Sequence, residues 1–310
     1  MTLNQWRDKG VITPEQYALL DALSRREPFS VFIELNILLY AGVIAFVGGL
    51  AWTAETYSRQ LGDVLVITVL SAILAACLWY CFSRAQPWST EETPSPNLVF
   101  DYVLYMGALT WSVELSYLES RFHLLSGQWD TYLLATAGFF FILAYRFDNR
   151  FVLSLALTSL AGWFGLKTSH WLGSNEDSYR TLAILYSAIT GLAGIALKRL
   201  AIKAHFFLTF LNLAANVFLV AVLSGVFNRV GYLLWFLLLV AACAASLAYG
   251  LTRKQFSFVA YATVYGYVGL SSVLLRDVNN ANEILTWFVI TGIVMLVLLF
   301  RMARRFGRET

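Results

Sequence analysis

The chain has 310 residues, of which 59% are hydrophobic and 13% are charged, with a mean hydropathy of +0.65 and a formal net charge of +3. An ordinary soluble domain carries about 25% charged residues, so this composition excludes a typical water-soluble enzyme and favours a protein whose solvent is lipid. The basic residues stand singly or in small clusters beside apolar stretches, without a continuous basic stripe, and we therefore expect no nucleic-acid partner.

Residues 1–30 are the first polar region of the chain, and we expect a cytoplasmic helical hairpin there. Thr13 is a good N-cap, Pro14 suits the first position of a helix, and Gln16 stands where a capping box requires it. A second short helix should therefore begin at Thr13, after a first one that ends at Gly10.

An apolar face is predicted on this hairpin. Tyr17, Leu20 and Leu23 share one side of the second helix at helical spacing, and Trp6 of the first helix can pack against them. We interpret these four residues as a docking surface for another membrane or cytoplasmic protein.

Long apolar stretches then follow one another almost without interruption. A helix needs about 20 apolar residues to cross a bilayer. We predict transmembrane helices at residues 32–54, 64–82, 98–118, 131–147, 150–168, 180–198, 205–225, 231–250, 256–275 and 284–301. The fold class expected is thus an all-α, polytopic integral membrane helix bundle of about ten transmembrane helices, spanning residues 31–301.

The connections between these helices are short. Arg146, Asp148, Asn149 and Arg150 form a polar knot between the fourth and fifth stretches, which is enough for a tight helical hairpin. The longest connection on the side of the N-terminus, residues 83–97, holds three prolines, and we expect it to be a flexible connector.

The basic residues give this arrangement a direction. With ten helices, 16 of the 22 Lys and Arg residues fall on the side of the N-terminus and 6 fall on the other side. Because Lys and Arg gather in cytoplasmic loops, both ends should lie in the cytoplasm, and residues 302–310 should form a basic cytoplasmic tail.

Acidic residues inside the predicted helices are the first candidates for function, because a carboxylate in hydrocarbon costs several kcal/mol unless it is paired or protonated. Asp101 lies within one turn of the cytoplasmic end and should reach headgroup water. Glu114 lies about one turn from the far end of the same helix, with Trp111 below it and Glu119 above it. A proton-linked or cation-binding carboxylate and a side chain that snorkels to the outer interface both fit Glu114, and we favour the second.

Asn212 and Asn216 form the deepest polar pair. Their spacing of four residues places both amides on one face of the seventh helix. Amides at this depth usually bond to neighbouring helices, and we prefer that interpretation to a solute site. His205, at the start of the same helix, is interpreted as an interfacial cap.

Enzyme chemistry has little support in the sequence. There is no glycine-rich phosphate loop, no GxSxG elbow and no HExxH motif. His170, Glu176 and Asp177 could in principle gather in an external loop and act on lipid, but their spacing matches no metal site. We expect no catalytic set, no metal and no cofactor.

Two further patterns concern helix packing and transport. All five prolines lie outside the predicted helices, whereas many secondary transporters use helices broken by proline or glycine. Small residues recur at four-residue spacing, as in Ser187 and Gly191 or Ser246 and Gly250, which allows close helix packing. A faint echo between the first and sixth stretches is the one sign of an inverted repeat.

A family resemblance rests on the N-terminal residues. Leu3-Asn4-Gln5-Trp6, Gly10-Val11-Ile12 and Glu15-Gln16, followed by a glycine-rich first helix that ends in Ala51-Trp52, resemble bacterial predicted membrane proteins of domain-of-unknown-function family 2157. The resemblance covers roughly the first 80 residues. It implies a multi-pass protein of the bacterial inner membrane and supplies no activity.

Two functional hypotheses follow. The first is a non-enzymatic membrane protein that acts through protein or lipid contacts, as a subunit or scaffold of a membrane complex, with residues 1–30 as its docking element. The alternative is a permease or exporter of a small or amphipathic solute, with Glu114, Asn212 and Asn216 along the path.

Overall fold

The computed structural model describes residues 6, 13, 15–17, 31–125, 128–172, 175–228, 230–278 and 280–309. The structure is 85% helix, and the described residues contain no strand. The all-helical fold class is therefore confirmed.

Each predicted apolar stretch coincides with one long helix. These helices are α3 (Val31–Leu61), α4 (Asp63–Arg84), α5 (Leu98–Phe122), α6 (Trp129–Phe147), α7 (Arg150–Leu172), α8 (Glu176–Arg199), α9 (Phe207–Val226), α10 (Tyr232–Thr252), α11 (Phe256–Leu274) and α12 (Ala281–Glu309), with a short 3-10 helix, η1 (Ala204–Phe206), before α9. α12 continues through the basic segment that we expected to form a separate tail.

Eight of the described helices are long and apolar enough to cross a membrane. The two long helices outside this set are α5 and α6. Both carry charged side chains within their length, among them Asp101 and Glu114 in α5 and Asp130 and Arg146 in α6, which lower their average apolarity. The chain is thus a membrane protein with several apolar helices.

The chain divides into two compact units, Met1–Val66 and Ile67–Thr310. In the first unit, the predicted capping box is present at Thr13 and Gln16. The backbone N–H of Thr13 donates to Gln16 Oε1 at 2.9 Å, and the N–H of Gln16 donates to Thr13 Oγ1 at 3.2 Å. The start of the second short helix is therefore confirmed, whereas Leu20 and Leu23 lie outside the described residues.

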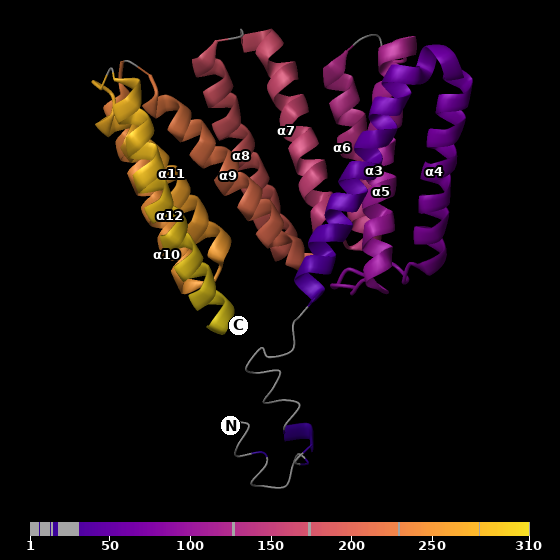
Figure 1. The fold of residues 1–310 in the computed structure, drawn as a ribbon, viewed down its shortest axis with the longest axis horizontal. Coiled ribbons are helices and arrows are strands. Elements are labelled where there is room, and N and C mark those ends of the chain that lie inside the picture. The colour runs from indigo at the N-terminus through magenta and orange to yellow at the C-terminus, as the bar shows by residue number, and fades with distance from the viewer. Residues whose placement is uncertain are drawn as a thin grey trace. The chain divides into compact units, whose positions relative to one another are not determined.

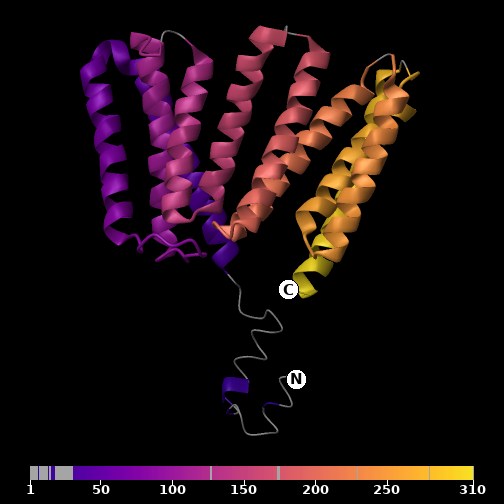
Figure 2. The same ribbon diagram turned by 180° about the vertical axis from the view of Figure 1, so that it is seen from behind.

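In the second unit, consecutive helices pack as antiparallel pairs, α6 with α7, α8 with α9 and α10 with α11 (Figures 1 and 2). The predicted hairpin between α6 and α7 is confirmed. Asp148 ends α6 in the left-handed conformation, with φ 57°, and its backbone N–H donates to the carbonyl of Ala144. Aspartate tolerates this conformation better than most residues, so a two-residue turn suffices.

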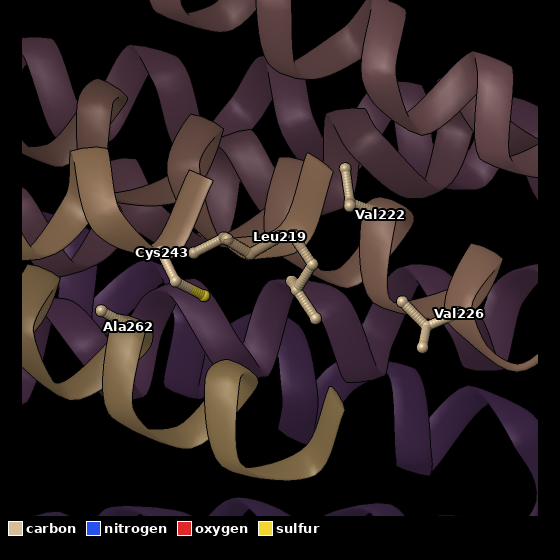
Figure 3. Close-up of a cluster of buried hydrophobic side chains, with 6 residues drawn as sticks. Leu219, Val222, Val226, Cys243 and Ala262 are labelled. Atoms are coloured by element: carbon tan, nitrogen blue, oxygen red, sulfur yellow. The ribbon is translucent and has the colours of Figure 1, made fainter. Parts of the chain in front are cut away.

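A buried apolar cluster joins α9, α10 and α11 in the second unit. It contains Leu219, Val222, Val226, Leu239, Cys243 and Ala262, and Figure 3 shows most of these side chains between the ribbons. Because lipid is as apolar as these side chains, tight packing rather than exclusion from water is the main gain of this cluster.

Small residues bring paired helices close together, as their spacing predicts. A Cβ atom at Gly250 would lie 2.7 Å from Val259 Cγ2 and 3.0 Å from the backbone nitrogen of Val259. One turn earlier, Ser246 donates to the carbonyl of Phe258 at 2.9 Å. Gly191 of α8 similarly faces Ala214 of α9.

The connection 83–97 differs from the flexible connector we expected. Lys203 donates its backbone N–H to the carbonyl of Thr90 at 2.9 Å, and Arg146 donates to the carbonyl of Gln86 at 3.0 Å. These two hydrogen bonds, one from a backbone N–H and one from a guanidinium, hold the loop against the end of α6 and the segment before α9.

Candidate functional site

The polar residues that the sequence singles out fall into separate places in the structure. The first is the start of α5, where Asp101 lies. Its Oδ1 accepts hydrogen bonds from Ser95 Oγ at 2.8 Å and from Asn149 Nδ2 at 3.0 Å. Asn149 also donates to the hydroxyl of Tyr105 at 3.1 Å. Asp101 therefore links the loop before α5 to the turn between α6 and α7.

Beside this link lies a buried ionic cluster formed by Asp148, Lys203 and His205. Lys203 Nζ lies 2.9 Å from Asp148 Oδ2, and His205 Nε2 forms a hydrogen bond with Asp148 Oδ1. The side chains of Asp148 and Lys203 are each only 2% exposed. A charge so deeply buried is tolerated only with partners, so each member depends on the others.

The loop 83–97 completes this cluster. The backbone N–H of Thr93 donates to Asp148 Oδ2 at 2.6 Å, and Lys203 Nζ donates to the carbonyl of Glu91 at 3.3 Å. At the surface next to it, Arg150 and Glu92 form an ion pair of 2.6 Å. The cluster thus fastens one loop and three helix ends together. His205 is part of it, rather than the interfacial cap we expected.

Glu114 is buried within α5 and faces α4. Only 8% of the residue is exposed, and its Oε1 accepts a hydrogen bond from Ser71 of α4. Its Oε2 has no hydrogen-bond partner among the described residues, and the same holds for Thr110 Oγ1 one turn earlier. The prediction that Glu114 snorkels to the outer interface is therefore wrong, because its carboxyl group lies inside the protein.

Asn212 and Asn216 lie on the face of α9 that we predicted. Asn216 Oδ1 accepts from the hydroxyl of Tyr265 at 3.0 Å and so ties α9 to α11, as expected for a buried amide. Asn212 donates to the carbonyl of Leu208 in its own helix at 2.8 Å. Both line a groove of ≈ 360 Å³ that also includes Arg150 and Tyr261.

Glu114 and the two asparagines are not brought together. The contacts of Glu114 are with α4, whereas the asparagines face α7 and α11, and Glu114 lines neither of the two large grooves in the described part of the molecule. A path that includes all three residues is not formed by this arrangement.

The external set His170, Glu176 and Asp177 is only partly described. His170 belongs to α7, but its side chain lies outside the described part of the structure, and Asp177 is paired with Arg180 at 2.6 Å. No group of three His, Cys, Asp or Glu residues that could hold a metal ion occurs among the described residues.

Sequence reasoning missed the role of Arg180, which entered only as one of the few external basic residues. It is 4% exposed and bridges α8 and α9. Its guanidinium donates to Ser224 Oγ at 3.1 Å and to Asn228 Oδ1 at 3.3 Å, and lies 5.0 Å from the centre of the Trp235 ring. The only signal in the sequence is a basic residue near the start of an apolar stretch. That position does not indicate that Ser224, 44 residues later, would be its partner.

A second groove, of ≈ 550 Å³, lies under this bridge between α8 and α9. Its walls are mainly apolar, and its polar groups are concentrated at the end that holds Glu176, Arg180 and Ser224. Asn216 lies at the opposite end and is shared with the groove described above. Apolar walls with polar groups at one end suit an amphipathic molecule.

Comparison with known proteins identifies the N-terminal region alone. No curated protein and no solved structure matches the chain. One sequence family does match, and it extends beyond the first 80 residues on which the resemblance rests, through α6 and into the start of α7. Residues 4–153 of this all-helical membrane protein match the family described as "Predicted membrane protein (DUF2157)".

Proposed function

We propose that the chain is a non-enzymatic, multi-pass protein of the bacterial inner membrane, which acts through protein or lipid contacts as a subunit or scaffold of a membrane complex. In this proposal all ten helices α3 to α12 cross the membrane, and both ends of the chain lie in the cytoplasm. The bias of basic residues towards one side supports this orientation.

The proposal rests mainly on the buried charged side chains, which bind other parts of the same chain. Asp148 binds both Lys203 and His205, Asp148 and Lys203 also bind the loop 83–97, and Arg180 bridges α8 and α9. These bonds fix helix ends against one another or against the loop. Buried polar groups that are satisfied by each other stiffen a structure, which is the property expected of a scaffold.

The N-terminal segment is the proposed docking element. The capping box at Thr13 and Gln16 gives its second helix a defined start, and Trp6 is 40% exposed. Tryptophan is enriched among the residues that contribute most of the binding energy in protein interfaces.

A photo-crosslinking amino acid at position 6 tests this element. Crosslinking in intact cells at native expression should give one discrete protein adduct from position 6. The matched control is position 88, an exposed tryptophan that lies on the same side in the proposed topology. An adduct shared by both positions, or no protein adduct from position 6, contradicts docking through this segment.

The alternative of a permease has one favourable observation, the groove lined by Asn212 and Asn216. This groove does not continue to Glu114, as the predicted solute path requires, because Glu114 lies against α4 and faces a different part of the bundle. Asn216 is moreover engaged with Tyr265. The geometry therefore supports the scaffold better than a solute path through these three residues.

A further inference from the structure

The space between α8 and α9 has the form of a wedge. The two helices are close at the end joined by η1, where a Cβ atom at Gly194 would lie 2.7 Å from Phe210 Cβ. They diverge towards Glu176 and Phe227 (Figures 1 and 2). The groove of ≈ 550 Å³ fills this opening and is within the range of about 300–1,000 Å³ typical of small-molecule sites.

The length of the groove matches one leaflet of a bilayer. It follows α9 from Asn216 to Phe227, which corresponds to about 16 Å at 1.5 Å per residue. Half of a hydrocarbon core about 30 Å thick is nearly the same length. Val217, Val220 and Ala221 supply the apolar wall, and Val220 is 48% exposed, so the groove is open at the side of the helix pair.

Arg180 stands at the wide end, and two of its N–H groups have no hydrogen-bond partner among the described residues. Its hydrogen bonds to Asp177, Ser224 and Asn228 account for three of the five N–H groups that a guanidinium carries. Trp235 supports the group from one side. The free N–H groups of an arginine held in this way can donate charge-assisted hydrogen bonds to a phosphate oxygen.

The charges around Arg180 restrict the headgroup further. Glu176 lines the same end of the groove and is exposed, and the side chain of Asp177 is 82% exposed. A purely anionic headgroup would meet two carboxylates beside one guanidinium. A zwitterionic headgroup presents its phosphate to Arg180, which also binds Asp177, and its ammonium to the Glu176 carboxylate, so that each headgroup charge meets an opposite charge. A primary ammonium can also donate hydrogen bonds to that carboxylate, which a quaternary ammonium cannot.

We infer that this groove binds one glycerophospholipid whose headgroup carries a phosphate and a primary ammonium, with one acyl chain along Val220. The inference rests on the proposed function, because it assumes that α8 and α9 cross the bilayer with Glu176 and Phe227 at one surface. It names the lipid contact that the proposed function leaves open.

Native mass spectrometry of the protein from mixed micelles tests this site. The micelles contain equal amounts of three phospholipids with the same acyl chains, whose headgroups carry a primary ammonium, a quaternary ammonium or a glycerol. The wild-type protein should retain the first in preference to the other two. Glu176→Gln should remove this preference but keep lipid binding, because the ammonium loses its carboxylate.

A bulky residue in the groove provides the matched pair of variants. Val220→Trp fills the space for the acyl chain and should lower bound lipid by about tenfold or more, since each buried methylene contributes to affinity. Leu185→Trp is the control. Leu185 lies on α8 and, like Val220 on α9, is about half exposed, but it does not line the groove.

Equal retention of the three lipids, preference for the glycerol headgroup, or unchanged binding by Val220→Trp would each overturn the inference. These outcomes are separable from failure of the docking proposal. The crosslink at position 6 should form in Val220→Trp as in the wild type, so loss of the lipid result with the crosslink intact refutes the groove alone. Selective lipid binding without the crosslink refutes docking alone.

Discussion

The Asp148 carboxylate accepts bonds from parts of the chain that lie far apart in the sequence. Thr93 precedes it by 55 residues, and Lys203 and His205 follow it by 55 and 57 residues. With both Asp148 and Lys203 nearly inaccessible, removal of one charge leaves the other buried without a counter-ion. This makes Asp148 the residue at which a conservative change has the largest expected effect.

Asp148→Asn should lower the free energy of unfolding by about 3–5 kcal/mol, the usual cost of breaking a buried ion pair. Asparagine tolerates the left-handed backbone at this position, so the change tests the charge rather than the turn. Unfolding of the purified protein in mixed micelles with increasing denaturing detergent measures the loss.

The control for this variant is Glu92→Gln, which removes the exposed ion pair with Arg150 in the same loop. Both side chains of that pair are more than half exposed, so the expected loss is below about 1 kcal/mol. A second variant, Asp148→Asn with Lys203→Met, should recover part of the stability, because it removes the buried lysine charge together with the carboxylate. Equal small effects of Asp148→Asn and Glu92→Gln would show that the cluster does not stabilise the fold.

The ionic cluster also marks a limit of sequence reasoning. Asp148 is recognisable as part of a polar knot, since it interrupts two apolar stretches, and Lys203 and His205 as polar residues near a helix start. Nothing local specifies that they meet, because the pairing is set by the packing of α6 and α7 against η1 and the loop 83–97. Glu114 shows the same limit, because its burial depends on α4 rather than on its depth in α5.

Helices are the scale at which the sequence is most informative. Apolar stretches of sufficient length, separated by short polar connections, place all the long helices from α3 to α12. The ends are less well determined, since α3 continues to Leu61 and α12 to Glu309. Both continuations are polar segments that extend an apolar helix. Their composition does not indicate where the helix should end.

The partners of each helix are harder to predict, because a helix surrounded by lipid is apolar on all sides and shows no clear face. The spacing of small residues is the exception. Ser246 and Gly250 lie on the side of α10 that contacts α11, and Gly191 on the side of α8 that contacts α9. Close approach requires small residues, so their positions indicate the contact surface directly.

Gly250→Ala should weaken the α10–α11 pair. The added methyl group would lie 2.7 Å from Val259 Cγ2 and close to the Val259 backbone, which a rotamer change cannot relieve. Overpacking of this kind costs about 1–3 kcal/mol, and the same detergent titration measures it.

Gly138→Ala in α6 is the matched glycine variant, because a methyl group there meets no atom within 4 Å among the described residues. It should be neutral or gain up to about 1 kcal/mol from the higher helix propensity of alanine. If the two variants are equally stable, α10 and α11 are not in the close contact described.

At the scale of the whole molecule, the number of membrane-crossing helices depends on α5 and α6. By length and composition, eight other described helices are candidates to cross the membrane, and α5 and α6 are not among them. Some of their charged groups have hydrogen-bond partners near the helix ends, which supports the proposal that the pair crosses the membrane. Asp101 is bonded to Asn149 at one end of α5, and at the other end Glu119 accepts from the backbone N–H of Leu125 at 2.6 Å.

The lengths of the two helices agree with a crossing. α5 has 25 residues and α6 has 19, which correspond to about 37 Å and 28 Å. α5 is longer than a hydrocarbon core of about 30 Å, and α6 falls short of that thickness by only about 2 Å. The number of crossings could not be fixed from the sequence, since a few charges are tolerated in a membrane helix only when partners elsewhere in the fold receive them.

Labelling of single added cysteines with a membrane-impermeant maleimide tests the ten-helix topology most directly. Leu124 in the turn after α5 and Trp88 in the loop before it are both exposed, whereas the native Cys77, Cys81 and Cys243 are buried. If α5 and α6 cross the membrane, Leu124→Cys reacts in intact spheroplasts and Trp88→Cys reacts only after permeabilisation. If both cysteines react only after permeabilisation, α5 and α6 do not cross, and the ten-helix account is wrong.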